Sequence, residues 1–346
     1  MNAPNSPSVY FEPDPGARGA GLKVLVVTNM YPHPAKPFLG VFVRQQVESL
    51  RAKGIGVDVL FVNGPASKLN YLRGAVSLRR LLRHSRYDLI HAHYIYSAAI
   101  ARLQVGIPII TTFHSGEFYS GWLEYQLSKF IARHVAANIV VSAPLKDFLP
   151  RSRATVIPCG VDLKWFHPMS HEESRRTLGL APNKKLVLFA AAKRPEKRFD
   201  LVEQAFQILS RNRADVDLVV LSGQPPERVP LYMNACDVLV LASDKEGSPQ
   251  VVKEAMACNL PIVSTPVGDV PEVIAGVEGC YLCSQLPEDI AEKLEMALAS
   301  GGRTDGYQHV AHLALEKVAD RLLAVYKEVL GVGEPTESRA VPAGRA

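Results

Sequence analysis

Short runs of apolar, β-branched residues recur along the chain, and a helix-length segment separates each run from the next. In the first half the runs cover residues 22–28, 57–62, 88–92, 107–113, 137–141 and 155–158; in the second half they cover 186–191, 217–222, 238–242, 260–264 and 279–282. Such alternation is typical of parallel sheets that carry helices on both faces. Because 346 residues are enough for two buried cores, we expect an α/β fold with two doubly wound, Rossmann-like domains facing each other across a cleft.

Breaks in this alternation place the boundaries of the predicted units. Pro and Gly are frequent at the start of the chain, and Pro168 with a polar run interrupts the pattern near its middle. Apolar residues at helical spacing then predict a terminal helix, which could cross back to the first domain. The predicted units are a disordered start (1–20), a first domain (21–167), a second domain (168–308), the terminal helix (309–330) and a disordered tail (331–346).

Charge is divided unevenly between the two halves of the chain. The net charge is +5, but residues 1–165 carry 19 Lys and Arg against 9 Asp and Glu, so the first half is basic and the rest is acidic. This asymmetry suggests that the first half meets an anionic surface or ligand. No recognisable nucleic-acid-binding module accompanies the charge, so we do not expect nucleic acid as the partner.

The chain lacks the sequence signals of a membrane-spanning or secreted protein. No apolar run reaches the ~18 residues of a membrane-spanning helix, and the first twenty residues have no apolar stretch of the kind found in secretion signals. The five cysteines are an odd number spread over a long chain, which favours reduced thiols. The expected location is therefore the cytoplasm, in solution or on the inner face of the cytoplasmic membrane.

One segment of the first half is basic and amphipathic. Between Asp58 and Asp88 there is no acidic residue, and the basic residues are Lys68, Arg73, Arg79, Arg80, Arg83 and Arg86. Leu69, Leu72, Val76 and Leu82 give the same segment an apolar stripe at helical spacing. Two interpretations stay open. The helix could lie on an anionic leaflet, where each basic residue would contribute roughly 1 kcal/mol to binding. Alternatively, it could pack its apolar stripe on the core and expose its basic face to solvent.

The segment 243–269 combines a strand exit, a tight turn and a helix start. The chain turns through Glu246-Gly247-Ser248-Pro249 and enters a predicted helix that contains Gln250 and Glu254. Pro249 is expected in the first turn of this helix, where its missing N–H would have had no partner. The first amides of a helix have no intrahelical partner and can bind a phosphate. The two glutamates suit hydroxyl binding better than a paired acid and base, because their separation is too uncertain for the latter. The alternative is an ordinary acidic helix start with an exposed glutamate.

Basic residues follow the first strand of the second half, and two histidines alternate on a strand of the first. Lys193, Arg194 and Lys197 could neutralise a diphosphate leaving group at a strand exit, or they could be a solvated charge run. His91 and His93 would share one face of their strand, but no third ligand at sensible spacing accompanies them. We therefore expect no metal and no cofactor.

These motifs resemble the retaining glycosyltransferases of family 4 (group 1), which have the GT-B fold of two Rossmann-like domains. The resemblance rests on E-x7-E within EGSPQVVKEAMACNLPIVSTPVGDVPEVI and on NMYPHPAKPFLGVFVRQQVESL, YDLIHAHY, IITTFHSGE, VIPCGVD and KRPEKRFDLV, in the family's order. The long string is especially similar to a subgroup of teichuronic-acid and surface-polysaccharide synthesis. The chain departs from the family at Ala192-Lys193, where Gly-Arg is usual, and in the short stretch 222–232.

The resemblance implies a role for each candidate residue. Glu246 would bind hydroxyls of the donor sugar, Glu254 the ribose, and the loop and helix start around Gly247, Ser248, Pro249 and Gln250 the donor. Lys197 would meet the diphosphate, with Lys193 or Arg194 in place of the family's arginine. His114 would lie at the donor sugar and take part in catalysis, although a lone histidine is more often structural. Gly40 would let a helix start approach the diphosphate, and Arg44 is a weaker candidate for an anionic acceptor.

The sequence therefore predicts an enzyme that moves a sugar from a nucleotide-diphosphate donor to a lipid-linked or growing glycan acceptor, with retention, in cell-surface polysaccharide synthesis. An anionic membrane surface is a further expected contact, through Arg73, Arg79, Arg80 and Arg83. The alternative is a catalytically weak nucleotide-sugar-binding subunit that recruits another transferase. The altered Gly-Arg pair favours that alternative, whereas the intact Glu246 and Glu254 pair favours the enzyme.

Overall fold

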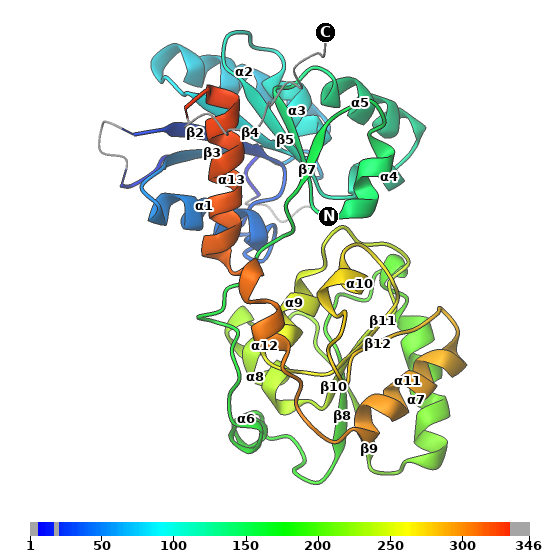
Figure 1. The fold of residues 1–346 in the computed structure, drawn as a ribbon. Coiled ribbons are helices and arrows are strands. Elements are labelled where there is room, and N and C mark those ends of the chain that lie inside the picture. Colours follow the sequence, from blue (N-terminus) through cyan, green and yellow to red (C-terminus); the bar gives the residue numbers. More distant parts are fainter. Residues whose placement is uncertain (1–5, 17–20, 333–346) are drawn as a thin grey trace, which may run out of the picture.

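The computed structural model describes residues 6–16 and 21–332 and contains two α/β domains, one above the other in Figure 1. Each domain is built around one sheet, and each sheet has a hydrophobic cluster on both of its faces. The alternation of strands with helix-length segments predicted this arrangement. Among the described residues, no helix is long and apolar enough to cross a membrane.

The first sheet has seven strands in the order β1-β3-β2-β4-β5-β6-β7. Six of them are parallel, whereas β1 pairs antiparallel with β3 at the edge. The start of the chain was expected to be disordered, and this is corrected for β1, whose Val9 pairs with Val62. The strands are β1 (Val9–Glu12), β2 (Lys23–Thr28), β3 (Gly56–Val62), β4 (Leu89–His93), β5 (Ile109–Phe113), β6 (Ala137–Val140) and β7 (Ala154–Val156).

Alternation within the central strand explains why both faces of the first sheet are covered. Val24 and Val26 of β2 point into one cluster, and Leu25 and Val27 point into the other. All four are at most 1% exposed, as in a parallel sheet buried on both sides. The helices of this domain are α1 (Val41–Ala52), α2 (Leu69–His84), α3 (Ile95–Ala101), α4 (Gly116–Tyr119), α5 (Trp122–Ala132) and the 3-10 helix η1 (Ala143–Phe148).

The second sheet has five parallel strands in the order β12-β11-β10-β8-β9. The strands are β8 (Lys185–Phe189), β9 (Val216–Val220), β10 (Val238–Leu241), β11 (Ile262–Ser264) and β12 (Tyr281–Leu282). The helices are α6 (His171–Leu178), η2 (Pro195–Lys197), α7 (Phe199–Asn212), η3 (Pro226–Arg228), α8 (Val229–Ala235), α9 (Gln250–Ala257), α10 (Val270–Val273), α11 (Pro287–Ala299), α12 (Gly306–His309) and η4 (Ala311–Leu313).

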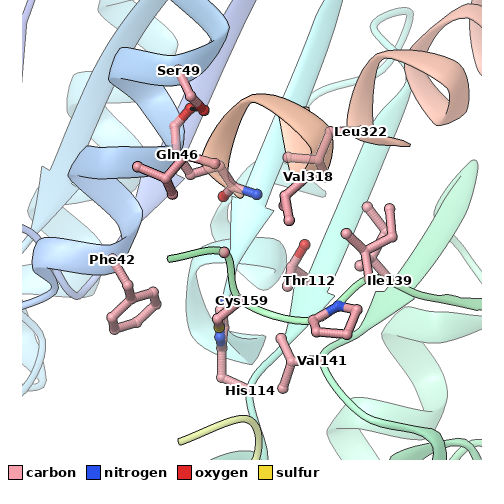
Figure 2. Close-up of a pocket in the computed structure, with 14 residues that line it drawn as sticks. Phe42, Gln46, Ser49, Thr112, His114, Ile139, Val141, Cys159, Val318 and Leu322 are labelled. Carbon is pink, nitrogen blue, oxygen red and sulfur yellow. Dashed lines mark hydrogen bonds between the residues drawn. The ribbon is translucent and has the colours of Figure 1, made fainter. Parts of the chain in front are cut away.

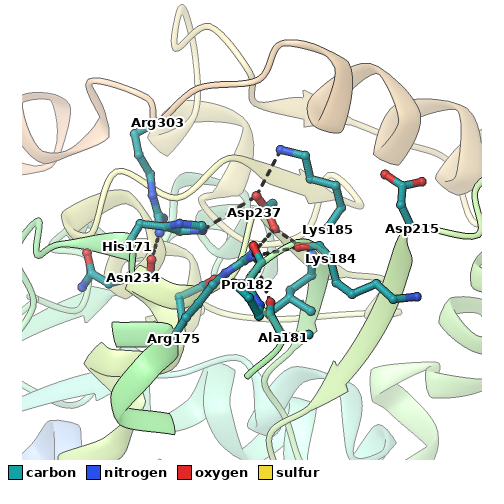
Figure 3. Close-up of polar contacts among 12 residues, drawn as sticks. His171, Arg175, Ala181, Pro182, Lys184, Lys185, Asp215, Asn234, Asp237 and Arg303 are labelled. Atoms are coloured by element: carbon teal, nitrogen blue, oxygen red, sulfur yellow. Dashed lines mark hydrogen bonds and ion pairs between the residues drawn. The ribbon is translucent and has the colours of Figure 1, made fainter. Parts of the chain in front are cut away.

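A buried arginine ties α6 to the start of the second sheet (Figure 3). The Arg175 guanidinium donates to the main-chain carbonyls of Ala181, Pro182 and Lys184 and to the Asp237 carboxylate at 2.6 Å. Asp237 also accepts from the Leu186 amide at 2.7 Å. Because Asp237 directly precedes β10, this network joins the polar segment before the second domain to two of its central strands.

The last helix, α13 (Leu315–Leu330), lies against the first domain beside α1, as Figure 1 shows. Its buried residues Leu322 and Tyr326 belong to the same cluster as Val24 of β2. The predicted terminal helix was longer, but α12 and η4 occupy the positions before Leu315. The chain passes between the domains twice, after β7 and before α13. These two segments pair with each other, because the Val161 amide donates to Leu313 O at 2.9 Å. The expected tail begins at 331, and its residues 333–346 lie outside the described part.

Candidate active site

A cleft of about 520 Å³ opens between the carboxyl ends of the two sheets. Both domains line it, as expected for two doubly wound sheets that face each other. The first domain contributes Phe38, Phe42, Tyr94, His114, Ser115, Val141 and Cys159; the second contributes 190–192, Arg194, Lys197 and 246–251. The structure thus brings together most of the predicted donor residues and His114.

An ion pair between Lys197 and Glu246 marks the second-domain side of the cleft. Lys197 ends η2, after β8, and Glu246 lies in the turn after β10. Both side chains are largely buried, and Ser243 donates a further hydrogen bond to the same Glu246 oxygen at 2.8 Å. Both bonds reach the same carboxylate oxygen of Glu246, so that, within the described part of the chain, the other oxygen is available for a ligand hydroxyl.

His114 lies opposite this pair and belongs to a row of histidines. Its Nε2 is 3.0 Å from Nδ1 of His93, whose ring packs on His91 at a centroid distance of 4.4 Å. His91 is hydrogen-bonded to Thr112 on β5 and to Tyr326 on α13. Burial lowers the pKa of His114 to about 3, so its imidazole is neutral at physiological pH.

Figure 2 shows a second, smaller cavity beside His114. It lies between α1, α13 and the segment 157–160, which follows β7. Gln46 and Ser49 of α1 and Val318 and Leu322 of α13 line its walls. Phe42, His114, Val141 and Cys159 line both this cavity and the cleft. The cleft and the smaller cavity therefore share part of their walls.

The turn of residues 246–249, which we call the donor loop after the role that the sequence resemblance implies for it, contacts the first domain at Gly247. A Cβ on Gly247 would stand 2.2 Å from the main-chain oxygen of His114, so that a larger residue cannot occupy this position without displacing backbone. Gly268, at φ +59°, packs against the other side of the same loop. Glycine at 247 is thus required for the two domains to approach at the cleft.

Other predicted residues lie apart from the cleft lining. Glu254 lies on α9 but is not among the lining residues, and burial raises its pKa to about 7. Lys193 turns its ammonium over the ring of Phe199, 3.7 Å from the centroid, whereas Arg194 lines the cleft. Arg44 pairs with Glu48 on the surface of α1.

Gly40 and Pro249 each precede a helix. Gly40 has φ +63°, and a Cβ there would stand 2.3 Å from the carbonyl carbon of Met30, so the local backbone itself requires glycine. Pro249 was expected in the first turn of its helix, but it is the residue just before α9. The Oε1 atom of Gln250, the first residue of α9, is buried and has no hydrogen-bond partner in the described part of the chain.

Sequence reasoning missed three residues around His114. Tyr94 stacks on the His114 ring at 4.6 Å, and both Tyr94 and Ser115 line the cleft with positive φ, which is strained for non-glycine residues. Glu117 accepts from the His114 amide with both oxygens at 3.3 Å, and burial raises its pKa to about 7. Its place three residues after His114, at the start of a helix, was the signal that could have found it.

The helix α2 forms a separate exposed surface. Leu69, Leu72 and Val76 are 64%, 68% and 55% exposed, while Asn70, Gly74 and Leu78 face the core. The arginines at 73, 79, 80 and 83 are exposed on the same helix. The apolar stripe expected from the sequence therefore points mostly to the outside, not to the core.

The geometry of two facing sheets and a polar cleft agrees with the comparisons to known proteins. The profile "Glycosyltransferase Family 4" matches residues 16–165, and "Glycosyl transferases group 1" matches residues 185–300. The chain belongs to the family 4, group 1 glycosyltransferases. In the residues that the structure describes, this glycosyltransferase has no group of three or more His, Cys, Asp or Glu that could hold a metal ion.

Two curated relatives of this glycosyltransferase illustrate its range of similarity. It is 26% identical over 321 residues to the D-inositol 3-phosphate glycosyltransferase of Segniliparus rotundus, covering 76% of this chain and 72% of the relative. It is 25% identical over 344 residues to the putative teichuronic acid biosynthesis glycosyltransferase TuaC of Bacillus subtilis. This match covers 79% of this chain and 88% of the relative. The relative named for teichuronic acid is compatible with the subgroup that the sequence resembles.

Solved structures confirm the GT-B fold of the glycosyltransferase. Sucrose-phosphate synthase from Thermosynechococcus elongatus superposes with a TM-score of 0.77 at 19% identity, over 90% of this chain and 100% of that chain. HepE of Anabaena in complex with UDP superposes with a TM-score of 0.67 at 16% identity. This match covers 89% of this chain and 100% of the HepE chain. At these identities the likeness concerns the fold.

Proposed function

We propose that this glycosyltransferase moves a sugar from a nucleoside diphosphate sugar to a hydroxyl of a lipid-linked or growing glycan acceptor, with retention at the anomeric carbon. The observation that carries the proposal is the Lys197–Glu246 ion pair facing His114 across a cleft shared by both domains. HepE, a protein of the same fold, was solved with UDP and with UDP and glucose. A cation beside a carboxylate suits a donor that carries both a diphosphate and sugar hydroxyls.

Cations of the second domain would stabilise the leaving diphosphate. Lys197 is paired with the Glu246 carboxylate, and a diphosphate can take the place of this carboxylate beside the Lys197 ammonium. Arg194 lines the same cleft. Lys193 lies over Phe199 instead, so Arg194 is the better substitute for the family's arginine. Because these charges lie beside the leaving group, we expect transfer to need neither a metal nor another cofactor.

The reaction would proceed on one face of the sugar. The bond between the anomeric carbon and the diphosphate oxygen breaks, and the acceptor oxygen forms its bond to the same carbon from the same side. The acceptor proton passes to the departing phosphate oxygen. The free oxygen of Glu246 and the amides of Gly247 and Ser248 would position the sugar, and neutral His114 would offer a hydrogen bond instead of a charge. Gln250 and Glu254, on the helix after the loop, would bind the nucleoside.

The first domain would receive the acceptor. Its α2 exposes three apolar side chains beside Arg73, Arg79, Arg80 and Arg83, which suits contact with an anionic leaflet. A surface of this kind would bring the cleft to a lipid-linked acceptor on the inner face of the cytoplasmic membrane. The similarity to a putative teichuronic acid biosynthesis glycosyltransferase supports a role in cell-surface polysaccharide synthesis.

A screen of nucleotide sugars tests the proposed function. Purified protein is incubated with each donor in EDTA, and release of the nucleoside diphosphate and thermal stabilisation are measured. Hydrolysis or transfer with at least one donor is expected, and the Lys197→Ala variant should retain its fold while losing turnover. Stabilisation by a donor that is never turned over would instead identify a nucleotide-sugar-binding partner subunit.

A further inference from the structure

A buried lysine lies directly behind the donor loop. Lys253 is on α9, and its side chain is 0% exposed. Its ammonium donates to Ser248 Oγ at 2.8 Å and to Asp269 Oδ1 at 3.0 Å, and it is 2.9 Å from Asp269 Oδ2. Asp269 follows β11 and is also buried. We call Ser248, Lys253 and Asp269 the anchor cluster.

The hydroxyl of Ser248 is fully used within the protein. It donates to Asp269 Oδ2 at 2.7 Å, accepts from Lys253, and accepts from the main-chain amide of Cys159 at 3.1 Å. A hydroxyl has one proton and two lone pairs, so these three bonds satisfy it completely. The side chain of Ser248 is therefore occupied in holding the loop, and only its main chain is free to contact a donor.

The bond from Cys159 crosses the boundary between the domains. Cys159 lies in the segment that leaves β7 of the first domain, whereas Ser248 lies in the donor loop of the second. The neighbouring amides at 157 and 161 donate to Val140 and Leu313 instead. The Cys159 amide is thus one identifiable hydrogen-bond link between the donor loop and the first domain, next to the contact of Gly247 with His114 and to Lys245, whose ammonium lies 5.0 Å from the centre of the Tyr119 ring.

Stability alone is a weak reason for such a cluster. Removing two charges from water costs several kcal/mol per ion. Replacing a buried ion pair by apolar residues of similar volume often leaves the stability of a protein unchanged or raises it. A buried ion pair does fix the orientation of the side chains that form it, because their hydrogen bonds are satisfied in one arrangement of these side chains. The anchor cluster places that directional constraint on the residue that follows Glu246 and Gly247 in the donor loop.

We propose that Lys253 and Asp269 are positioning residues, which orient Ser248 so that the donor loop is held on the Cys159 amide and the two domains are aligned for transfer. The inference rests on the proposed transfer from a nucleotide sugar. The donor binds to the second domain, but reaction requires groups of both domains in register. Loss of the anchor therefore lowers kcat and leaves the KM for the donor little changed.

Two variants separate positioning from stability. Ser248→Ala removes the hydroxyl, and the double variant Lys253→Met with Asp269→Leu removes both charges while keeping apolar volume in their place. We expect the double variant to unfold within a few degrees of the wild type, yet to have a kcat at least tenfold lower and a donor KM within threefold. Ser174→Ala is the control, because it removes another buried hydroxyl of the second domain, whose one hydrogen bond among the described residues goes to Ser170 O. It should leave both constants unchanged.

Amide hydrogen exchange tests the link without any donor. In full-length protein, the Cys159 amide should exchange at least tenfold faster in Ser248→Ala and in the double variant than in the wild type, while the Val161 amide stays protected. Unchanged exchange at Cys159, or a stable double variant with wild-type kcat, overturns the proposal. A wild type that turns over no donor contradicts the proposed function instead, and the exchange result still decides the link.

Discussion

Lys193 and Arg194 are neighbours in the chain, but they have different surroundings in the structure. Lys193 lies over the Phe199 ring, and Arg194 lines the cleft that also holds Lys197 and Glu246. The sequence left open which of the two replaces the family's arginine, because adjacent residues in a loop have no fixed direction. The structure favours Arg194.

Substitution of these two residues gives a matched test at the residue scale. Arg194→Met should lower the rate of transfer by roughly a hundredfold, the effect of losing one group that stabilises developing charge. Lys193→Met should change that rate less than threefold and cost about 0.5–1 kcal/mol of stability through the lost cation–π contact. Steady-state kinetics and thermal unfolding of both variants decide the matter. The assignment is wrong if Lys193→Met is the more damaging change.

Glu117 predicts a pH dependence of stability. Burial raises its pKa to about 7 in the folded protein, so folding favours the protonated form. The stability that this group contributes is fully present below its unfolded pKa and is lost as the pH rises through about 7. Glu117→Gln should therefore raise the free energy of unfolding at pH 8 by up to about 3 kcal/mol relative to wild type, with little gain at pH 4. Denaturant unfolding at the two pH values measures this difference, and an equal effect at both would contradict it.

At the scale of the element, α2 and β1 mark what the sequence can and cannot predict. Periodicity found most strands, because buried parallel strands read as apolar runs. It also found the amphipathic character of α2, but not which stripe faces the core, since Asn70 and Gly74 take the inner positions. Strand β1 was missed because its residues lie in a segment rich in Pro and are only half buried at an edge. Their pairing with β3 depends on a partner about fifty residues away.

The exposed face of α2 predicts binding to anionic vesicles. Replacing Arg79, Arg80 and Arg83 by Gln should weaken binding at low salt by about 3 kcal/mol, roughly a hundredfold, because each charge contributes about 1 kcal/mol near the surface. Sedimentation with anionic and neutral vesicles measures the change. The charge-matched control replaces Arg176, Arg211 and Arg228 of the second domain, which are also exposed. Equal retention of the two triple variants, or no retention of the wild type, would end the membrane proposal.

At the scale of the molecule, several contacts join parts of the chain that are far apart in sequence. The donor loop reaches the first domain at His114 and Cys159, and α13 returns from the second domain to bury Leu322 and Tyr326 beside β2. Motif order could predict the two domains and most of the cleft lining. It could not predict the Lys197–Glu246 pair or the anchor cluster, because these depend on how separate loops meet in space.

The return of α13 implies that the end of the chain stabilises the first domain. Leu322→Ala should lower the free energy of unfolding by about 2–5 kcal/mol, since Leu322 is completely buried. Lys327→Ala, at an exposed position of the same helix, should change it by less than about 0.5 kcal/mol. Chemical denaturation followed by circular dichroism compares the two. A small effect of Leu322→Ala would mean that α13 packs loosely.

The proposed sugar transfer in the cleft depends on the Lys197–Glu246 pair. The direct measurement is the release of nucleoside diphosphate by wild type, Lys197→Met and Glu246→Gln, with the donor found in the screen and with unfolding temperatures recorded in parallel. Turnover by the wild type, and a loss of at least a hundredfold in both variants at unchanged unfolding temperature, is the predicted result. Near-normal turnover in both folded variants would contradict this role of the pair.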